Sequence, residues 1–188
     1  MAWDFETEPE FEKKLAWMRA FMKEEVFPLE TLAAEFRSPE GRAVYDKITA
    51  PLKEQVKEQG LWAAHLPPEL GGGGFGQVKL GLMHEILGQS PLGPRIFGNN
   101  APDSGNAELL SLGGTEEQKK KWMEPLLNQE IRSCFSMTEP GAGADPTLLT
   151  TQAVRDGDEW IVSGHKWFSS NASVSDILIV MVKTNLDE

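Results

Sequence analysis

Apolar residues along the first two-thirds of the chain recur at the spacing of amphipathic helices. The first stripe comprises Phe11, Leu15, Met18 and Met22, and the second comprises Val44, Ile48, Leu52 and Val56. Steps of three and four residues place each set on one face of a helix. Gly60 marks a natural end for the second helix. A third helix is predicted over residues 82–87, where apolar residues cluster ahead of Gly88.

Polar residues mark where helices should begin. Two segments have the Thr-x-x-Glu/Gln form of a capping box: TEPE, which begins at Thr7, and TEEQ, which begins at Thr115. The second box opens a predicted helix through KKKWMEPLL, whose lysine run is expected to form a solvated face. Asp103 is expected to cap the apolar segment that comes after it.

The pattern changes from helical to extended near residue 130. Apolar and polar residues alternate in IRSCFSMT. Two extended runs in TTQAVRDGDEWIVSGHKWF are joined at Asp156-Gly157, which predicts a hairpin with a positive-φ turn. The segment DILIVMVKT is almost continuously apolar, which is typical of a strand buried on both faces. We therefore expect an α-helical domain over residues 1–129 and a β domain over residues 130–188.

The glycine-rich segment LPPELGGGGFG, residues 66–76, is predicted to be a loop. It lacks the Gly-Lys-Ser/Thr of a P-loop and the preceding strand of a dinucleotide fingerprint, so it does not indicate phosphate binding. The three histidines, His65, His84 and His165, are scattered without metal-ligand spacing. No metal site is therefore expected.

Composition narrows the class of protein. The 188 residues are 40% hydrophobic and 25% charged, as in a soluble globular protein. No apolar run approaches the roughly 18 residues that span a bilayer, and the N-terminus lacks a signal-peptide pattern, so no membrane partner is expected. The net charge of −11 argues against nucleic acid. Cys134 is the single cysteine, expected half-buried in a strand, and a cytoplasmic location is expected because no disulfide can form.

A loop of small residues is the first candidate for chemistry. Residues 141–144, within CFSMTEPGAGAD, leave a backbone that a flat or phosphorylated ligand can approach without a side chain in between. Thr138 can hydrogen-bond a heteroatom, and Asp145 can orient the loop amides or cap the segment after it.

A second candidate is the segment KWFSS, where Trp167 stands beside two hydroxyls. Alternation along a strand would send Trp167 and Ser169 to the same face, where an indole and a hydroxyl can pack along a planar ring system and bond its edge. Taken singly, each candidate is more simply explained by structure alone, as a strand-end turn or a core tryptophan. Together they indicate a flat heteroaromatic cofactor in the β domain.

The sequence resembles the acyl-CoA dehydrogenase family across nearly the whole chain. That family's middle-domain signatures, Thr-Glu-Pro-Gly-x-Gly-x-Asp and Gly-x-Lys-x-Trp-Ile-Thr, are similar to FSMTEPGAGAD and VSGHKWFSSNASVSDILIVMVKT. Its Pro-Glu-x-x-Gly-Gly-x-Gly loop is similar to GLWAAHLPPELGGGGFG, and its helix-and-entry segment to GTEEQKKKWMEPLLNQEIRSCFSMTEP. Within the family, the segments APDSGNAELL and KWFSS are most similar to the branch related to the kinase-fused members.

The resemblance implies an α+β fold, in which an N-terminal all-α helical domain precedes an incomplete antiparallel β-barrel domain. It also implies an FAD enzyme that desaturates an acyl-CoA thioester. In such enzymes a glutamate removes the α-proton while the β-hydrogen leaves as hydride to flavin N5. The implied partners are the acyl-CoA substrate and an electron-transfer flavoprotein, and the full-length enzyme would be a homo-oligomer, either a tetramer or a dimer.

The resemblance also implies which residues contact the cofactor. Thr138 would offer its backbone N–H and hydroxyl to flavin N1 and O2, and Trp167 would pack against the isoalloxazine. Ser169 would lie with its hydroxyl near N5 and its backbone amide near O4. Ala144 stands where many members have serine, so it has no polar role. The implied cofactor-binding residues are Phe135, Met137, Thr138, Gly143, Ala144, Trp167 and Ser169.

The chain ends at Glu188, which is partway through the implied β domain. The resemblance places the catalytic glutamate in the absent C-terminal half, so neither Glu139, Glu85 nor Glu108 is assigned as a base and the chain alone is expected to be inactive. Two alternatives stay open: a non-catalytic module that binds an acyl chain or a partner protein, and an FAD oxidase on the same scaffold. An exposed ILIVMV strand would need a cover, such as a complementary chain or a symmetric dimer.

Overall fold

The computed structural model describes residues 7–184, apart from the side chain of Arg37. The chain divides into two compact units, residues 1–104 and 105–188. The division predicted after Gln129 lies within the second unit and stays a prediction. Among the described residues, none of the helices combines the length and the apolar character that crossing a bilayer requires.

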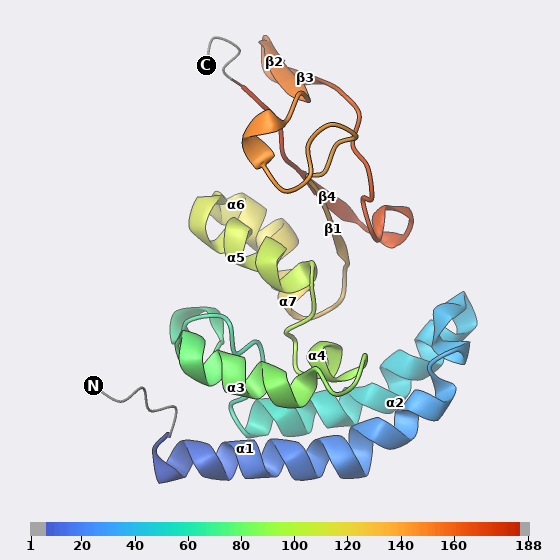
Figure 1. Cartoon of the computed structure of the whole chain (residues 1–188), viewed down its shortest axis with the longest axis vertical. Coiled ribbons are helices and arrows are strands. Elements are labelled where there is room, and N and C mark those ends of the chain that lie inside the picture. Colours follow the sequence, from blue (N-terminus) through green and yellow to red (C-terminus); the bar gives the residue numbers. More distant parts are fainter. Residues whose placement is uncertain (1–6, 185–188) are drawn as a thin grey trace. The chain divides into compact units, whose positions relative to one another are not determined.

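The first unit is built from helices (Figure 1). Its elements in chain order are α1 (Pro9–Phe21), the π-helical turn η1 (Met22–Val26), the 3-10 turns η2 (Phe27–Leu32) and η3 (Glu35–Arg37), α2 (Pro39–Glu58), the 3-10 turn η4 (Pro68–Leu70), α3 (Gln77–Leu87) and α4 (Gly93–Ile96). The three helices predicted here are therefore confirmed, and Gly88 directly follows α3 as predicted.

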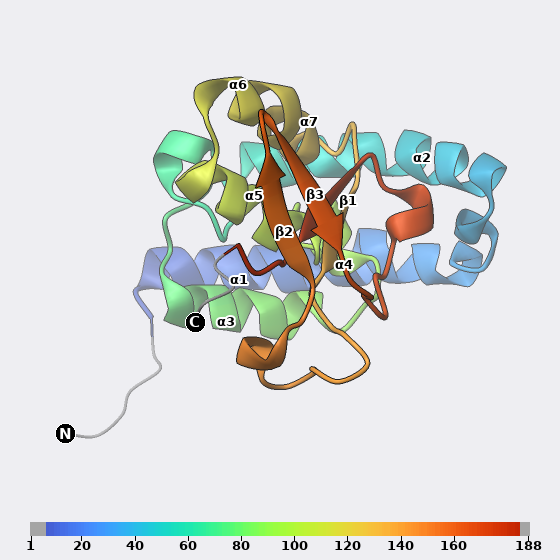
Figure 2. The same cartoon turned by 90° about the horizontal axis from the view of Figure 1, so that it is seen from above.

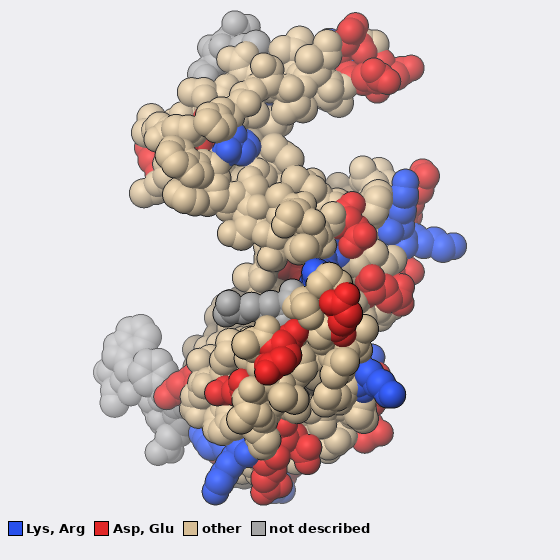
Figure 3. Space-filling view, turned by 90° about the vertical axis from the view of Figure 1, so that its right-hand side faces the viewer, with Lys and Arg blue, Asp and Glu red and all other residues tan. Residues whose placement is uncertain are grey.

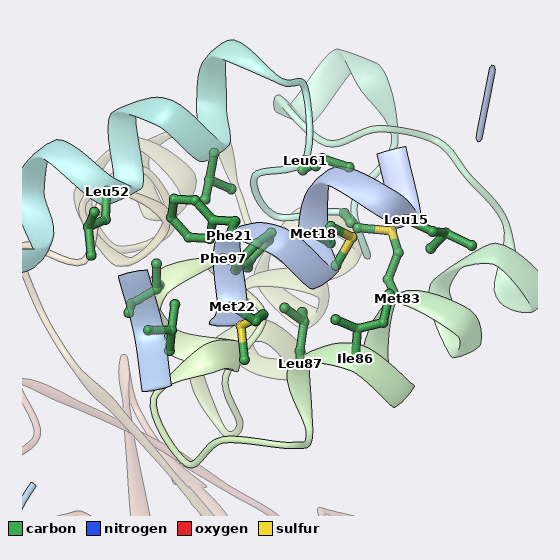
Figure 4. Close-up of a cluster of buried hydrophobic side chains, with 14 of the residues drawn as sticks. Leu15, Met18, Phe21, Met22, Leu52, Leu61, Met83, Ile86, Leu87 and Phe97 are labelled. Atoms are coloured by element: carbon green, nitrogen blue, oxygen red, sulfur yellow. The ribbon is translucent and has the colours of Figure 1, made fainter. Parts of the chain in front are cut away.

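The first stripe of apolar residues forms the centre of this unit's core (Figure 4). Side chains from α1 pack there against α2, α3 and Phe97, which is fully buried. The prediction that the second stripe is the buried face of its helix is partly wrong. Val44 is 50% exposed, and α2 instead buries Tyr45 and Thr49 beside Leu52. Thr49 can be buried because its hydroxyl donates to the Tyr45 carbonyl oxygen at 2.8 Å.

The two predicted capping boxes have different outcomes. Helix α1 begins at Pro9 without any side-chain cap, and the Thr7 hydroxyl donates to Glu12 instead. Proline already suits the first helical position, because it has no N–H that needs a partner and its φ is fixed. The box at Thr115 is confirmed: its hydroxyl accepts from the Gln118 N–H at 3.2 Å, and its N–H donates to the Gln118 side chain at 2.9 Å.

The second unit begins with helices and continues into strands. Its elements are α5 (Asp103–Gly113), whose first two residues belong to the first unit, α6 (Glu116–Gln118), the π-helical turn η5 (Lys119–Met123), α7 (Glu124–Leu127), β1 (Ser133–Ser136), the 3-10 turn η6 (Pro146–Leu148), β2 (Gln152–Asp156), β3 (Glu159–Ser163), the 3-10 turn η7 (Ala172–Val174) and β4 (Ile177–Val180). Asp103 is the first residue of α5, so it lies one position inside the helix that it was expected to cap.

The strands form two separate pairs: Figure 1 shows β1 beside β4, and Figure 2 shows the hairpin of β2 and β3. The predicted hairpin is confirmed: β2 and β3 are antiparallel, and Gly157 at the turn has a φ of 60°. By contrast, β1 pairs with β4 in parallel, with Cys134 opposite Leu178. Backbone hydrogen bonds from Lys183 to Thr151 and from Ala153 to Lys183 connect the two pairs. A helical part followed by an open β part agrees with the predicted fold class.

The prediction that the ILIVMV strand is buried on both faces is wrong. Leu178 and Val180 are 46% and 40% exposed, and Ile177 and Ile179 are partly buried. Within residues 7–184, β4 pairs with β1 alone, so its other edge is unpaired, and the face that carries Leu178 and Val180 is exposed. On the face seen in Figure 3 the β part, at the top, carries few charged side chains.

Candidate cofactor site

The loop that follows β1 lies against the segment that follows β3. The Trp167 N–H donates to the Thr138 carbonyl oxygen at 2.8 Å. The hydroxyls of Ser136 and Ser169 share a hydrogen bond of 2.6 Å. Two motifs that are about thirty residues apart in the sequence are thus joined by backbone and side-chain bonds.

A buried carboxylate lies at the centre of the junction, which is the contact between the loop that follows β1 and the segment that follows β3. Glu139, which is 4% exposed, accepts hydrogen bonds of 2.5–2.9 Å from the N–H groups and hydroxyls of Thr150 and Thr151. Its fifth donor is Lys166, whose ammonium lies 2.9 Å away and also donates to the Met137 carbonyl oxygen at 2.8 Å. The carboxylate therefore links the loop, the start of β2 and the Trp167 segment.

These donors decide the charge state of the carboxyl group. The Thr150 hydroxyl, followed by the Thr151 hydroxyl, holds the pKa of Glu139 far below its usual range, although desolvation opposes them. The group stays ionised and its oxygens are occupied by donors. A carboxylate with so low a pKa is a poor proton acceptor, so Glu139 is suited to structure rather than to proton transfer.

The loop of small residues is open on its outer side. The Glu139 and Ala142 backbones exchange two hydrogen bonds of 3.0 and 3.1 Å, which close a tight turn. Neither Gly141 nor Gly143 has a left-handed φ, and a Cβ added to either would meet nothing within 4 Å. The described chain therefore has no need of glycine at these positions, and their absent side chains leave backbone that an external group can approach.

The far end of the loop is held by a side-chain cap. The Asp145 carboxylate accepts from the Thr147 N–H at 3.0 Å and from its hydroxyl at 2.7 Å, and it thereby caps η6 as predicted. The Thr147 hydroxyl is the main cause of the lowered pKa of Asp145. Ala144, just before it, is exposed.

The Trp167 segment is not the strand that the alternation argument assumed, so that argument is wrong. Strand β3 ends at Ser163, and Phe168 has a φ of 56°, which an extended strand does not allow. Trp167 is 49% exposed. Its ring is nearly parallel to the His165 ring, with centroids 6.5 Å apart, and is tilted by 26° from the Phe168 ring, with centroids 5.2 Å apart.

The structure brings most of the predicted cofactor residues to this junction. Phe135, Met137 and Thr138 are partly buried on or just after β1, and Trp167 and Ser169 adjoin them through the bonds above. The Thr138 N–H and hydroxyl have no hydrogen-bond partner among residues 7–184. Gly143 and Ala144 lie beyond the Glu139 turn, on the exposed part of the loop.

Sequence reasoning missed the residues that hold the junction together. Lys166, Thr150 and Thr151 were not assigned any role, although Lys166 is a fixed position of the signature. The signal was the lysine itself, because a charged side chain that is largely buried needs a partner of opposite charge or a hydrogen-bond acceptor. Its partner is 27 positions away in sequence, and only the fold shows the pairing.

The remaining candidates lie elsewhere. Cys134 is fully buried rather than half-buried, and burial raises the pKa of its thiol, so it is no nucleophile. Within the described residues, no three His, Cys, Asp or Glu side chains gather as metal ligands. In the first unit, His65 bonds Asn99 at 2.8 Å and borders a hollow of about 220 Å³ beside the glycine-rich loop.

Two family models match the chain, and together they cover most of its length. The N-terminal domain of acyl-CoA dehydrogenase matches residues 8–130, and the middle domain of acyl-CoA dehydrogenase matches residues 134–188.

Individual relatives agree with these matches. Acyl-CoA dehydrogenase family member 11 from Gallus gallus is 40% identical over 174 residues, which are 89% of this chain and 22% of the relative. FadE2 of Mycobacterium tuberculosis, a candidate acyl-CoA dehydrogenase, is 39% identical, and the match covers 89% of this chain and 42% of the FadE2 chain. A solved structure of a candidate acyl-CoA dehydrogenase from Mycobacterium abscessus is 34% identical with a TM-score of 0.81, over 97% of this chain and 48% of that one. The chain thus spans less than half the length of each.

Proposed function

Because the chain belongs to the acyl-CoA dehydrogenase family, we propose that it forms the N-terminal helical domain and the flavin-contacting part of the middle domain of an FAD-dependent acyl-CoA dehydrogenase. One observation carries the proposal: the Thr138 loop and the Trp167 segment, which the resemblance assigns to the two sides of one cofactor, are hydrogen-bonded to each other. Bound FAD would supply the hydride acceptor for the α,β-dehydrogenation of an acyl-CoA thioester.

The residues at the junction fit a flat, electron-accepting ring. Thr138 keeps an N–H and a hydroxyl free, among residues 7–184, for an acceptor edge, and such fixed donors stabilise negative charge that develops on reduction. Trp167 offers a half-exposed aromatic face. Phe135 and Met137 contribute apolar surface beside Thr138, and Ser169 contributes a hydroxyl already oriented by Ser136.

The loop residues fit the phosphate-bearing part of the same cofactor. Gly143 leaves its backbone uncovered, and Ala144 adds only a methyl group, so a diphosphate can approach the backbone N–H groups. The net charge of −11 does not oppose this, because backbone donors bind an anion without a basic side chain.

The proton-abstracting group is proposed to lie outside these 188 residues. Glu139 is occupied by five donors, and Glu85 and Glu108 lie on α3 and α5 without any motif that would assign them a role. The chain by itself would therefore bind and orient, whereas the complete protein would carry out the reaction on an acyl-CoA substrate, pass electrons to an electron-transfer flavoprotein, and assemble as a homo-oligomer.

Titration of the protein with FAD, followed by quenching of flavin fluorescence, tests the proposal. Trp167→Ala is expected to weaken binding about two- to tenfold, since stacking on one aromatic face contributes about 0.5–1.5 kcal/mol. Trp160→Ala is the matched control, because Trp160 is similarly exposed at 53% but lies on the hairpin. Saturable binding that only Trp167→Ala weakens supports the proposal, and no binding, or equal loss in both variants, contradicts it.

A further inference from the structure

The peptide group between Met137 and Thr138 is held on one side and free on the other. Its carbonyl oxygen accepts from the Lys166 ammonium at 2.8 Å, whereas its N–H has no partner among residues 7–184. Ala101–Pro102 is the one cis peptide in the described chain, so this peptide is trans. In a trans peptide the C=O and the N–H point in opposite directions, and fixing the carbonyl therefore aims the N–H.

The next peptide group is held by the next residue. The carbonyl oxygen of Thr138 accepts from the Trp167 N–H at 2.8 Å. Lys166 and Trp167 thus bind the consecutive carbonyls of Met137 and Thr138. Both peptide planes that flank the Thr138 side chain are fixed, and neither bond uses the Thr138 N–H or hydroxyl.

The Lys166 ammonium is held beside the Met137 carbonyl oxygen by its surroundings. The Lys166 side chain is 11% exposed, and its charge is balanced by Glu139 at 2.9 Å. Glu139 is in turn held by the N–H groups and hydroxyls of Thr150 and Thr151. A buried cation with a fixed counter-ion keeps one geometry, because losing either partner would leave an uncompensated charge.

We propose that Lys166 is a positioning residue, which orients and polarises the Met137–Thr138 peptide so that the Thr138 N–H is a strong donor toward the cofactor edge. A cation on the carbonyl oxygen draws electron density from the peptide and strengthens the hydrogen bond that the same peptide donates. The effect is largest when the acceptor is negatively charged, which is the reduced form of the flavin. The inference rests on the proposed function, to which it adds a residue that strengthens the binding of the reduced flavin.

The first test uses the protein without cofactor. Lys166→Met removes the charge, and Lys166→Arg keeps a cation at the same place. The expected result is an upfield shift of the Thr138 amide proton in Lys166→Met, partly restored in Lys166→Arg. Lys183→Met is the matched control, because Lys183 lies in the same unit and contacts Thr151 and Ala153 through its backbone. An unchanged Thr138 amide in Lys166→Met would overturn the proposal.

The second test compares oxidised and reduced FAD. Lys166→Met is expected to weaken binding of reduced FAD about tenfold more than binding of oxidised FAD, which lowers the midpoint potential of the bound flavin by about 30 mV. Equal weakening of both forms would mean that Lys166 only supports the fold. If Lys166→Met does not fold, the double variant Glu139→Gln/Lys166→Met removes both charges and answers the same question.

The two proposals fail in different ways. If the unmodified protein binds no FAD, the proposed function is wrong, and the Thr138 amide shift still decides whether Lys166 polarises the peptide. If the unmodified protein binds FAD and the potential is the same in Lys166→Met, the proposed function stands and the role of Lys166 is wrong.

Discussion

Replacing Gly164 by alanine should damage the junction without touching any proposed cofactor contact. A Cβ at Gly164 would lie 2.3 Å from the Thr151 hydroxyl oxygen and 2.6 Å from the Thr151 Cα, whereas ordinary contacts begin near 3.4 Å. The backbones must therefore separate by about 1 Å, and such overpacking costs about 1–3 kcal/mol. Thr151 also donates two of the hydrogen bonds to Glu139, so the displacement reaches the carboxylate.

Thermal unfolding followed by circular dichroism measures the effect. A chain of this length loses about 2–4 °C of Tm per kcal/mol, so Gly164→Ala is expected to lower Tm by about 2–12 °C. The control is Gly143→Ala, whose Cβ would meet nothing within 4 Å and which should leave Tm unchanged or raise it by about 1–4 °C. Equal Tm values for the two variants would show that the close approach of Gly164 to Thr151 has no energetic consequence, contrary to this prediction.

Four further outcomes are expected from the described contacts. Because the pKa of Glu139 is lowered in the folded protein, its contribution to stability is complete above the unfolded pKa of about 4.3 and is lost as the pH falls below it, so an acid titration of unfolding should be less steep for Glu139→Gln. Cys134, buried with a raised pKa, should react with a thiol reagent only after unfolding; rapid reaction in the native state would contradict its burial. Leu87→Ala should cost about 2–5 kcal/mol in urea unfolding, whereas Leu112→Ala, at an 81% exposed position, should change little. Val180→Lys on the exposed face of β4 should reduce self-association in sedimentation experiments, and a wild-type protein that stays monomeric at all concentrations would show that this face needs no cover.

The helices could be predicted from sequence because burial of one apolar face decides their formation. The stripe from Phe11 to Met22 is buried as its spacing predicts. The second helix was found but its buried face was misjudged, because Tyr45 and Thr49 have polar groups that count against burial in a sequence pattern. The Thr49 hydroxyl donates to a backbone carbonyl of the same helix, so Thr49 can be buried without leaving a polar group unpaired.

The candidate site could be predicted only as two separate motifs. The sequence indicated the loop and the Trp167 segment, but its reason for placing Trp167 beside Ser169 assumed a strand that the positive φ of Phe168 interrupts. The Glu139 network joins the motifs, and its donors come from two other segments of the chain. Such pairing depends on tertiary contacts and has no local signature.

The exposed β4 strand shows a different limit. Its composition indicates burial on both faces, and the described residues provide cover for one face at most. The apolar composition of β4 therefore suits a strand that is covered on both faces, and residues 7–184 supply only part of that cover.

If this chain forms the flavin-contacting part of an acyl-CoA dehydrogenase, the protein that contains it should hold bound flavin. The most direct measurement is the visible absorption spectrum of the intact polypeptide that contains these 188 residues, recorded anaerobically before and after addition of acyl-CoA thioesters. The spectrum is expected to show the bands of bound flavin, and these bands should bleach when a suitable acyl-CoA is added. A folded protein that has no flavin bands, and that acquires none on addition of FAD, would contradict it.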